Sequence, residues 1–91
     1  MKAAMPPVVL AELAQDPDWK MRNAAARNAA APPAVLAELA RDQIPEVREE
    51  VASNAATPPQ SLAELARDSD IKVRGGALRN RAVLLEDLSQ I

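Results

Sequence analysis

Residues 32–42 are PPAVLAELARD, and nearly the same string occurs 26 residues earlier at 6–16 (PPVVLAELAQD) and 26 residues later at 58–68 (PPQSLAELARD). After each string comes an apolar residue followed by Arg, and an Asn closes the unit. So many positions with one shared period identify an internal repeat. The 91 residues therefore contain three copies of a 26-residue unit and the beginning of a fourth.

The first part of each unit predicts a short helix. Proline fits the first helical turn, because its missing N–H would have no partner there. In the middle unit Leu36, Leu39 and Ala40 then fall on one apolar stripe. We expect this helix to end near Asp42.

The second part of each unit predicts another helix, of roughly two turns. In the middle unit Val47, Val51, Ala52 and Ala55 line one face. We expect it to stop around Asn54, in the left-handed conformation that Asn tolerates at the end of a helix. The next Pro-Pro prevents its continuation.

Two polar residues are expected to cap helix starts. Asp16, with Pro17 after it, is the predicted N-cap of the second helix in the first unit. Thr57, just before Pro-Pro, is the predicted N-cap of the first helix in the third unit.

Helices this short are marginal in water by themselves, so the units are predicted to stack and share their apolar faces. No segment alternates with period two, and we expect no strands. The prediction is a single repeat domain over residues 1–91, with units of about 2–27, 28–53 and 54–79 and a partial fourth over 80–91.

Composition narrows the function. The chain has no Cys and no His, one aromatic residue and a net charge of -2. These absences remove thiolate sites, the commonest metal ligand and the commonest general base. No recognisable catalytic or phosphate-binding motif is present, so we expect no enzyme and no cofactor. Without a signal peptide or a long apolar run, we expect a soluble cytoplasmic protein without membrane contact.

The repeat resembles the leucine-rich repeat variant family. The residues that carry the resemblance, with their copies 26 residues to either side, are Pro32, Pro33, Leu36, Leu39, Ala40, Asp42, Val47, Arg48, Val51, Ala52 and Asn54. The resemblance covers nearly the whole chain and implies an all-α, right-handed α-solenoid related to HEAT and armadillo repeats.

The family resemblance also implies α-helices alternating with 3₁₀-helices, and the sequence does not decide which helix of each unit is 3₁₀. The family's usual repeat is slightly shorter than this one, which favours two α-helices here. An iron–sulfur cluster is associated with one member of the family; it needs Cys, so it is not carried over. The family implies no enzymatic activity.

A repeated Asp–Arg pattern has two interpretations. The residues are Asp16, Arg22, Asp42, Arg48, Asp68 and Arg74. They could form a charged surface for a ligand, but we favour a structural ladder in which Arg of one unit bonds Asp of an adjacent unit. Asn28, Asn54 and Asn80 could likewise form a recognition code, but side-chain amides that bond the backbone at each turn are the favoured interpretation.

Two features break the repeat. Trp19 stands where the other units have Pro45 and Ile71, just before the second helix. It could pack over the helix start, or act as a binding hot spot, where Trp is enriched. Gly75-Gly76 could reflect close packing, a local break or drift, and we favour a weakened last unit, because Gly costs about 1 kcal/mol in a helix interior.

The predicted function is a non-catalytic scaffold for protein–protein interaction, with an unidentified partner that could bind at Trp19, Lys72, Arg79 and Arg81. The alternative is nucleic-acid binding through the basic stretch Lys72–Arg81, which lacks interleaved aromatic residues. A further expectation is self-association through the apolar residues near the end of the chain, which are Leu84, Leu85, Leu88 and Ile91.

Overall fold

The computed structural model describes residues 5–80, which form six α-helices and no strand. The helices are α1 (Pro7–Leu13), α2 (Trp19–Arg27), α3 (Pro33–Leu39), α4 (Pro45–Ser53), α5 (Pro59–Leu65) and α6 (Ile71–Arg79). The predicted all-α repeat fold is therefore confirmed, with one pair of helices per unit.

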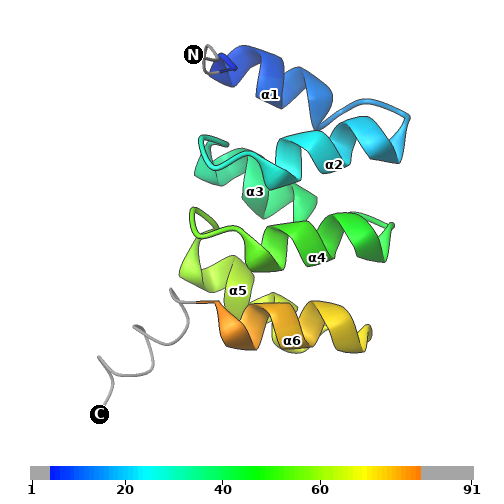
Figure 1. The fold of residues 1–91 in the computed structure, drawn as a ribbon, viewed down its shortest axis with the longest axis vertical. Helices are drawn as coiled ribbons and strands as arrows, with labels where there is room; N and C mark the ends of the chain where they lie inside the picture. The colour runs from blue at the N-terminus through cyan, green and yellow to red at the C-terminus, as the bar shows by residue number, and fades with distance from the viewer. Residues whose placement is uncertain (1–4, 81–91) are drawn as a thin grey trace.

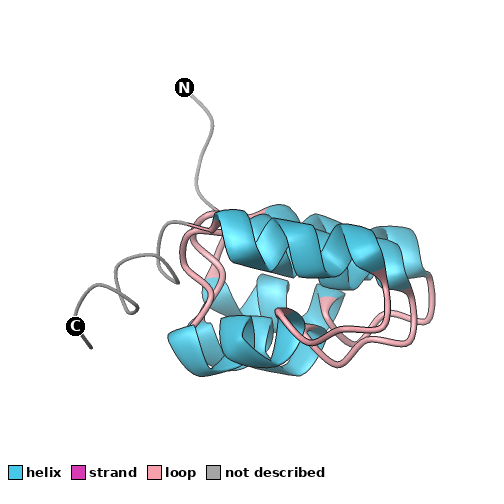
Figure 2. Cartoon of the chain, turned by 90° about the horizontal axis from the view of Figure 1, so that it is seen from below, coloured by secondary structure: helices cyan, strands magenta, loops and turns pink. Residues whose placement is uncertain are grey.

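The helices are arranged in two layers (Figures 1 and 2). The second helices of the three units, α2, α4 and α6, lie side by side in one layer (Figure 1). The first helices, α1, α3 and α5, form the other layer. Helix α4 contacts both α2 and α6, so it is covered on two sides.

The Pro-Pro pair determines where the first helix of each unit begins. In α1, α3 and α5 the second proline of each pair is the first helical residue, and the first proline has extended backbone at the N-cap. The predicted end near Asp42 is wrong by three residues, because α3 stops at Leu39. The chain leaves the helix in a tighter turn, in which the Asp42 amide donates to the Leu39 carbonyl at 3.1 Å.

All six helices between residues 5 and 80 are α-helices, as the length of the repeat favoured. The alternation with 3₁₀-helices that the family resemblance implied does not occur in this range. Hydrogen bonds of the 3₁₀ type occur at the ends of the helices, for example from the Asp16 amide to the Leu13 carbonyl at 3.1 Å.

The predicted cap of α2 is wrong. Asp18, not Asp16, is the N-cap, and its carboxylate accepts a hydrogen bond from the Lys20 amide at 2.9 Å. Pro17 therefore lies before the helix, and Trp19 is the first residue inside it. The Asp16 carboxylate instead accepts the Asp18 amide at 2.8 Å and closes the loop ahead of the helix.

The predicted cap of α5 is also wrong. Pro58 is the N-cap, and Thr57 lies one residue earlier with its side chain buried. The Thr57 hydroxyl donates to the Val51 carbonyl at 2.7 Å, so it satisfies the end of α4.

The predicted left-handed residue at the end of α4 is wrong as well. Asn54 has φ of -83° and ψ of 122°, which is extended backbone, and no residue between 5 and 80 has a positive φ. The chain needs no left-handed turn there, because the extended conformation leads directly into the next Pro-Pro segment. Ala55 falls beyond the end of α4 and is exposed, so it is not on the apolar face.

The hydrophobic core is a thin layer of Leu, Val and Ala between the helices. Its fully buried large side chains include Leu36, Leu39, Val47 and Val51, and it includes small residues such as Ala52. Side chains this small bring helices close together. Helices too short to be stable alone are thereby stabilised by packing on their neighbours.

Gly76 shows how close this approach is. Helix α6 runs without a break over Ile71–Arg79, so the glycines do not interrupt it. A Cβ at position 76 would lie 3.2 Å from Cβ of Ala52 and 3.4 Å from Oγ of Ser53. Gly76 therefore allows α6 to contact α4 closely, while the predicted weakening of the last unit stays a prediction.

Candidate functional site

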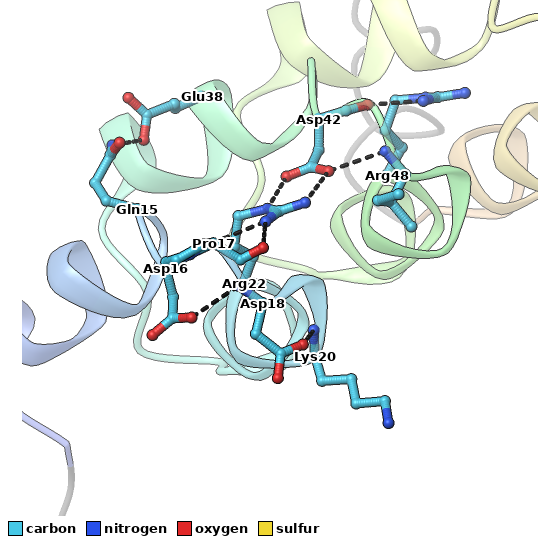
Figure 3. A network of polar contacts seen from close by, with 10 residues as sticks. Gln15, Asp16, Pro17, Asp18, Lys20, Arg22, Glu38, Asp42 and Arg48 are labelled. Atoms are coloured by element: carbon cyan, nitrogen blue, oxygen red, sulfur yellow. Dashed lines mark hydrogen bonds and ion pairs between the residues drawn. The ribbon is translucent and has the colours of Figure 1, made fainter.

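Arginine–aspartate pairs join the units at one end of the second helices (Figure 3). Arg22 donates from Nε to Oδ2 of Asp42 at 2.7 Å and from Nη2 to Oδ1 at 3.2 Å. Arg48 makes the same two bonds to Asp68 at 2.8 and 3.0 Å. Each pair is bidentate, the strongest geometry of such an ion pair, and each links one unit to the next.

The arginine side chains also donate hydrogen bonds to the loop before the second helix of their own unit. Nη1 of Arg48 donates to the Asp42 carbonyl at 2.7 Å, and Arg74 bonds the Asp68 carbonyl in the same way at 2.8 Å. The Asp42 carboxylate additionally accepts the Ile44 amide at 2.9 Å, and its side chain is only 7% exposed. These groups are occupied by the fold, so a ligand could bind them only by breaking the junction.

The pairs shift the ionisation of both aspartates. Burial raises the pKa of Asp42 and of Asp68. The hydrogen bonds from Arg22 and Arg48, the backbone amides and the arginine charges outweigh burial, so both pKa values lie below the ordinary value. Both carboxylates are therefore ionised at neutral pH.

Asparagines join the units at the opposite end of the second helices. Nδ2 of Asn54 donates to the carbonyls of Ala26 and Asn28 at 2.9 and 3.0 Å, and its Oδ1 accepts the Ala56 amide at 2.9 Å. Nδ2 of Asn80 donates in the same pattern to the carbonyls of Ala52 and Asn54, at 2.7 and 3.0 Å. These amides satisfy carbonyl groups at the C-terminus of the preceding second helix.

The side chains of the first Asn and the first Asp make only local hydrogen bonds within residues 5–80. Asn28 accepts the Ala30 amide at 2.8 Å, and Asp16 accepts the Asp18 amide. The last arginine, Arg74, donates to the carbonyls of Asp68 and Ser69. The inter-unit bonds therefore belong to the α2–α4 and α4–α6 junctions of the described range.

Trp19 is partly buried and packs against the hydrophobic core from the first position of α2. This contact corresponds to the packing interpretation of the residue. Its binding role stays a prediction.

The outward side of the second-helix layer is charged, and we call it the second-helix face. It is formed by residues spaced three, four and seven apart, which share one side of a helix. On α2 they are Lys20, Asn23, Ala24 and Arg27; on α4, Glu46, Glu49, Glu50 and Ser53; on α6, Lys72, Gly75 and Arg79. Gly76, at the register of Ala24 and Glu50, is buried against α4 instead.

Two of the predicted partner-binding residues, Lys72 and Arg79, lie exposed on the second-helix face. Arg81 lies outside the described residues, as do Leu84, Leu85, Leu88 and Ile91. Trp19 begins α2, at the edge of the same layer.

Sequence reasoning missed the acidic residues between the basic ones. Glu46 stands at the position of Lys20 and Lys72 in the other units, and Glu49 and Glu50 follow it on α4. The signal was present in the alignment of the three units, where the charge changes sign at equal register. The basic stretch in Lys72–Arg81 is therefore next to an acidic helix.

Two hollows lie between α4 and α6. The acidic hollow has about 240 Å³ and is lined by Pro45, Glu46, Glu49, Asp70, Ile71 and Lys72. The arginine hollow has about 250 Å³ and is lined by Ser53, Ala55, Gly76, Arg79 and Asn80. They lie toward opposite ends of the α4–α6 junction, and we call the pair of hollows the α4–α6 groove; each could hold a side chain of a bound polypeptide.

Residues 5–80 contain no cluster of three or more acidic side chains arranged to hold a metal ion. In the same range no helix combines the length and apolar character needed to cross a membrane.

Comparison with known proteins identifies the repeat. The leucine rich repeat variant family model matches residues 45–70, a stretch as long as one unit that runs from the start of α4 to the residue before α6. No curated protein and no solved structure is significantly similar to the chain. The match confirms the resemblance stated from the sequence for one unit: residues 45–70 are similar to the leucine rich repeat variant family.

Proposed function

We propose that this chain is a non-catalytic repeat scaffold, acting in the cytoplasm, that binds a partner protein through its second-helix face. The observation that carries the proposal is that the polar residues of the second helices fall into two groups with different roles. The aspartate, arginine and asparagine side chains at the two ends of the second helices hold the junctions. The charged side chains on the second-helix face, between these two ends, do not hold the junctions.

The second-helix face supports this proposal by its chemistry. Lys20, Lys72 and Arg79 make no side-chain hydrogen bond or ion pair with another residue in the range 5–80. Exposed charges contribute little to folding stability. They can instead orient and select a partner by complementary charge.

An affinity-capture experiment tests the proposal with variants of identical composition. The double variant Glu46→Lys/Lys72→Glu exchanges two charges on the second-helix face and preserves the net charge. The control, Glu12→Arg/Arg67→Glu, exchanges two exposed charges on or beside the first helices. Circular dichroism and urea unfolding establish that both variants are folded.

We expect the wild type and the control to retain the same protein from a native lysate in a saturable manner, and the second-helix variant to lose it. Failure to retain any protein saturably would contradict the interaction function. Equal retention by both variants would contradict the assignment to the second-helix face.

The nucleic-acid alternative gains no support from this arrangement. Lys72 and Arg79 on α6 are separated from Lys20 and Arg27 on α2 by the acidic helix α4. A phosphate backbone that follows the layer would meet the carboxylates of α4, whereas nucleic-acid binding needs a continuous basic surface.

A further inference from the structure

The α4–α6 groove has opposite charges at its two ends. Glu46 and Glu49 line one hollow and Arg79 lines the other, while α4 and α6 form the walls. These charges indicate what kind of partner segment fits the groove.

The acidic hollow suits a basic side chain. Of its three carboxylates, that of Asp70 is occupied, because it accepts the amides of Lys72 and Val73 at 2.8 and 3.2 Å. The side chains of Glu46 and Glu49 accept no hydrogen bond and form no ion pair within residues 5–80. Even with Lys72 beside them, the hollow keeps an excess of negative charge.

Apolar walls complete the acidic hollow. Pro45 lines it from α4 and Ile71 from α6, and Ile71 is 73% exposed. Lys and Arg side chains place their aliphatic stems on apolar surface while the charged end reaches a polar group. Pro45 and Ile71 would contact such a stem while Glu46 and Glu49 bind the cation.

The arginine hollow suits a carboxylate. Gly76 lines this hollow beside Ser53 and contributes no side chain to it. A Cβ at position 75 would lie 3.0 Å from Nη1 of Arg79, so the guanidinium lies directly over the glycine. This guanidinium has no acidic partner in the described range, and its planar set of donors matches a carboxylate.

Helix geometry gives the spacing between the two ends. Glu49 and Ser53 are four residues apart on α4, about 6 Å along the axis, and Glu46 and Ser53 are seven apart, about 10 Å. An extended peptide advances about 3.3 Å per residue. Two or three residues of extended chain therefore connect the acidic hollow to the arginine hollow.

We propose that the α4–α6 groove binds an extended segment of a partner protein that carries a Lys or Arg and, two or three residues away, an Asp or Glu. The basic side chain enters the acidic hollow and the acidic side chain binds Arg79. This inference rests on the proposed function and names the class of partner.

Fluorescence anisotropy with labelled synthetic peptides tests this inference directly. The probes carry one Arg and one Asp, two or three residues apart and in either order, in an alanine–serine background. Control peptides carry two Arg, two Asp, or the opposite charges eight residues apart. The protein variants are Glu49→Lys and Arg79→Glu, with Glu12→Lys as the control on α1.

We expect closely spaced opposite charges to bind the wild type about fivefold more tightly than any control peptide, because each control peptide can form only one of the two ion pairs. Glu49→Lys and Arg79→Glu should each weaken binding by about fivefold or more, and Glu12→Lys by less than twofold. The converse test uses a two-Asp peptide, which Glu49→Lys should bind more tightly than the wild type does.

Two results would overturn the inference. One is equal binding of same-charge and opposite-charge peptides, and the other is unchanged binding in both groove variants while circular dichroism shows them folded. Neither result touches the proposed function, which fails only if affinity capture recovers no saturable protein partner.

Discussion

Replacing Asn54 by Ala isolates the contribution of the asparagine bonds to the stability of the stack. Asn54 makes two inter-unit bonds, to the carbonyls of Ala26 and Asn28, and one local bond from the Ala56 amide. The Asn28 side chain makes the equivalent local bond, from the Ala30 amide, but no inter-unit bond within residues 5–80; only its backbone carbonyl accepts one, from Asn54. Asn28→Ala is therefore a matched control from the same repeat position.

The expected magnitude follows from these bonds. A net hydrogen bond contributes about 1 kcal/mol, and a buried group left without a partner costs about 1–3 kcal/mol. Ala26, whose carbonyl accepts one of the Asn54 bonds, is fully buried, so water has little access to that carbonyl. We expect Asn54→Ala to lower the free energy of unfolding by about 3 kcal/mol and Asn28→Ala by about 1 kcal/mol.

Urea unfolding measures this difference with two probes. Far-ultraviolet circular dichroism follows all helices, and the fluorescence of Trp19, the only aromatic residue, follows the first unit. Coincident transitions would show that the units unfold together. A difference of about 2 kcal/mol between the variants corresponds to about 8–16 °C in Tm for a chain of this size. Equal destabilisation by Asn54→Ala and Asn28→Ala would refute the assigned role of the inter-unit bonds.

Three further predictions concern the junctions. The pKa values of Asp42 and Asp68 lie below the unfolded value of about 3.9, so these two carboxylates stabilise the fold fully above that pH and lose this effect as pH falls through their folded pKa values. Asp68→Asn should therefore reduce the loss of stability at low pH in an acid-unfolding profile, and an unchanged profile would contradict this role of Asp68. Gly75→Ala should raise Tm, since Ala favours the helix by about 1 kcal/mol and only the flexible end of Arg79 must move. Gly76→Ala should raise Tm less, or lower it, because the new Cβ would press on Ala52, and the reverse order in calorimetry would contradict the close contact of α6 with α4. Amide exchange should be faster in α6 than in α4, which is covered on two sides, and equal protection would argue against a weaker last unit.

The sequence predicted the fold well because the repeat multiplies each local signal. Pro-Pro marks the helix start in each of three units, and the apolar stripe that includes Leu36 and Leu39 recurs at the same register. The Arg–Asp pairing between units was predicted from the resemblance to HEAT-like repeats together with chemistry, since a guanidinium and a carboxylate placed once per unit can bond across a junction.

The two N-cap predictions that failed were displaced from the true caps by one or two residues. Asp16 and Thr57 are good N-cap types, and both do bond the backbone, but each belongs to the loop beside the expected position. Local sequence does not distinguish an aspartate that caps a helix from one that closes the loop two residues before it. The acidic face of α4 was missed for another reason: Glu46 and Glu49 become a surface feature only when α2 and α6 lie on either side.

The arrangement of polar groups explains why one surface can vary without loss of the fold. The core of each junction consists of Leu, Val and Ala, which pack in many registers and define alignment weakly. Bidentate Arg–Asp pairs hold one end of each second helix, and asparagine amides hold the other. Because these directional bonds align both ends of the second helices, the charged side chains on the second-helix face between the ends are not needed to hold the units together. The change from Lys20 to Glu46 to Lys72 at equal register then alters the charge presented to a partner and leaves the stack intact.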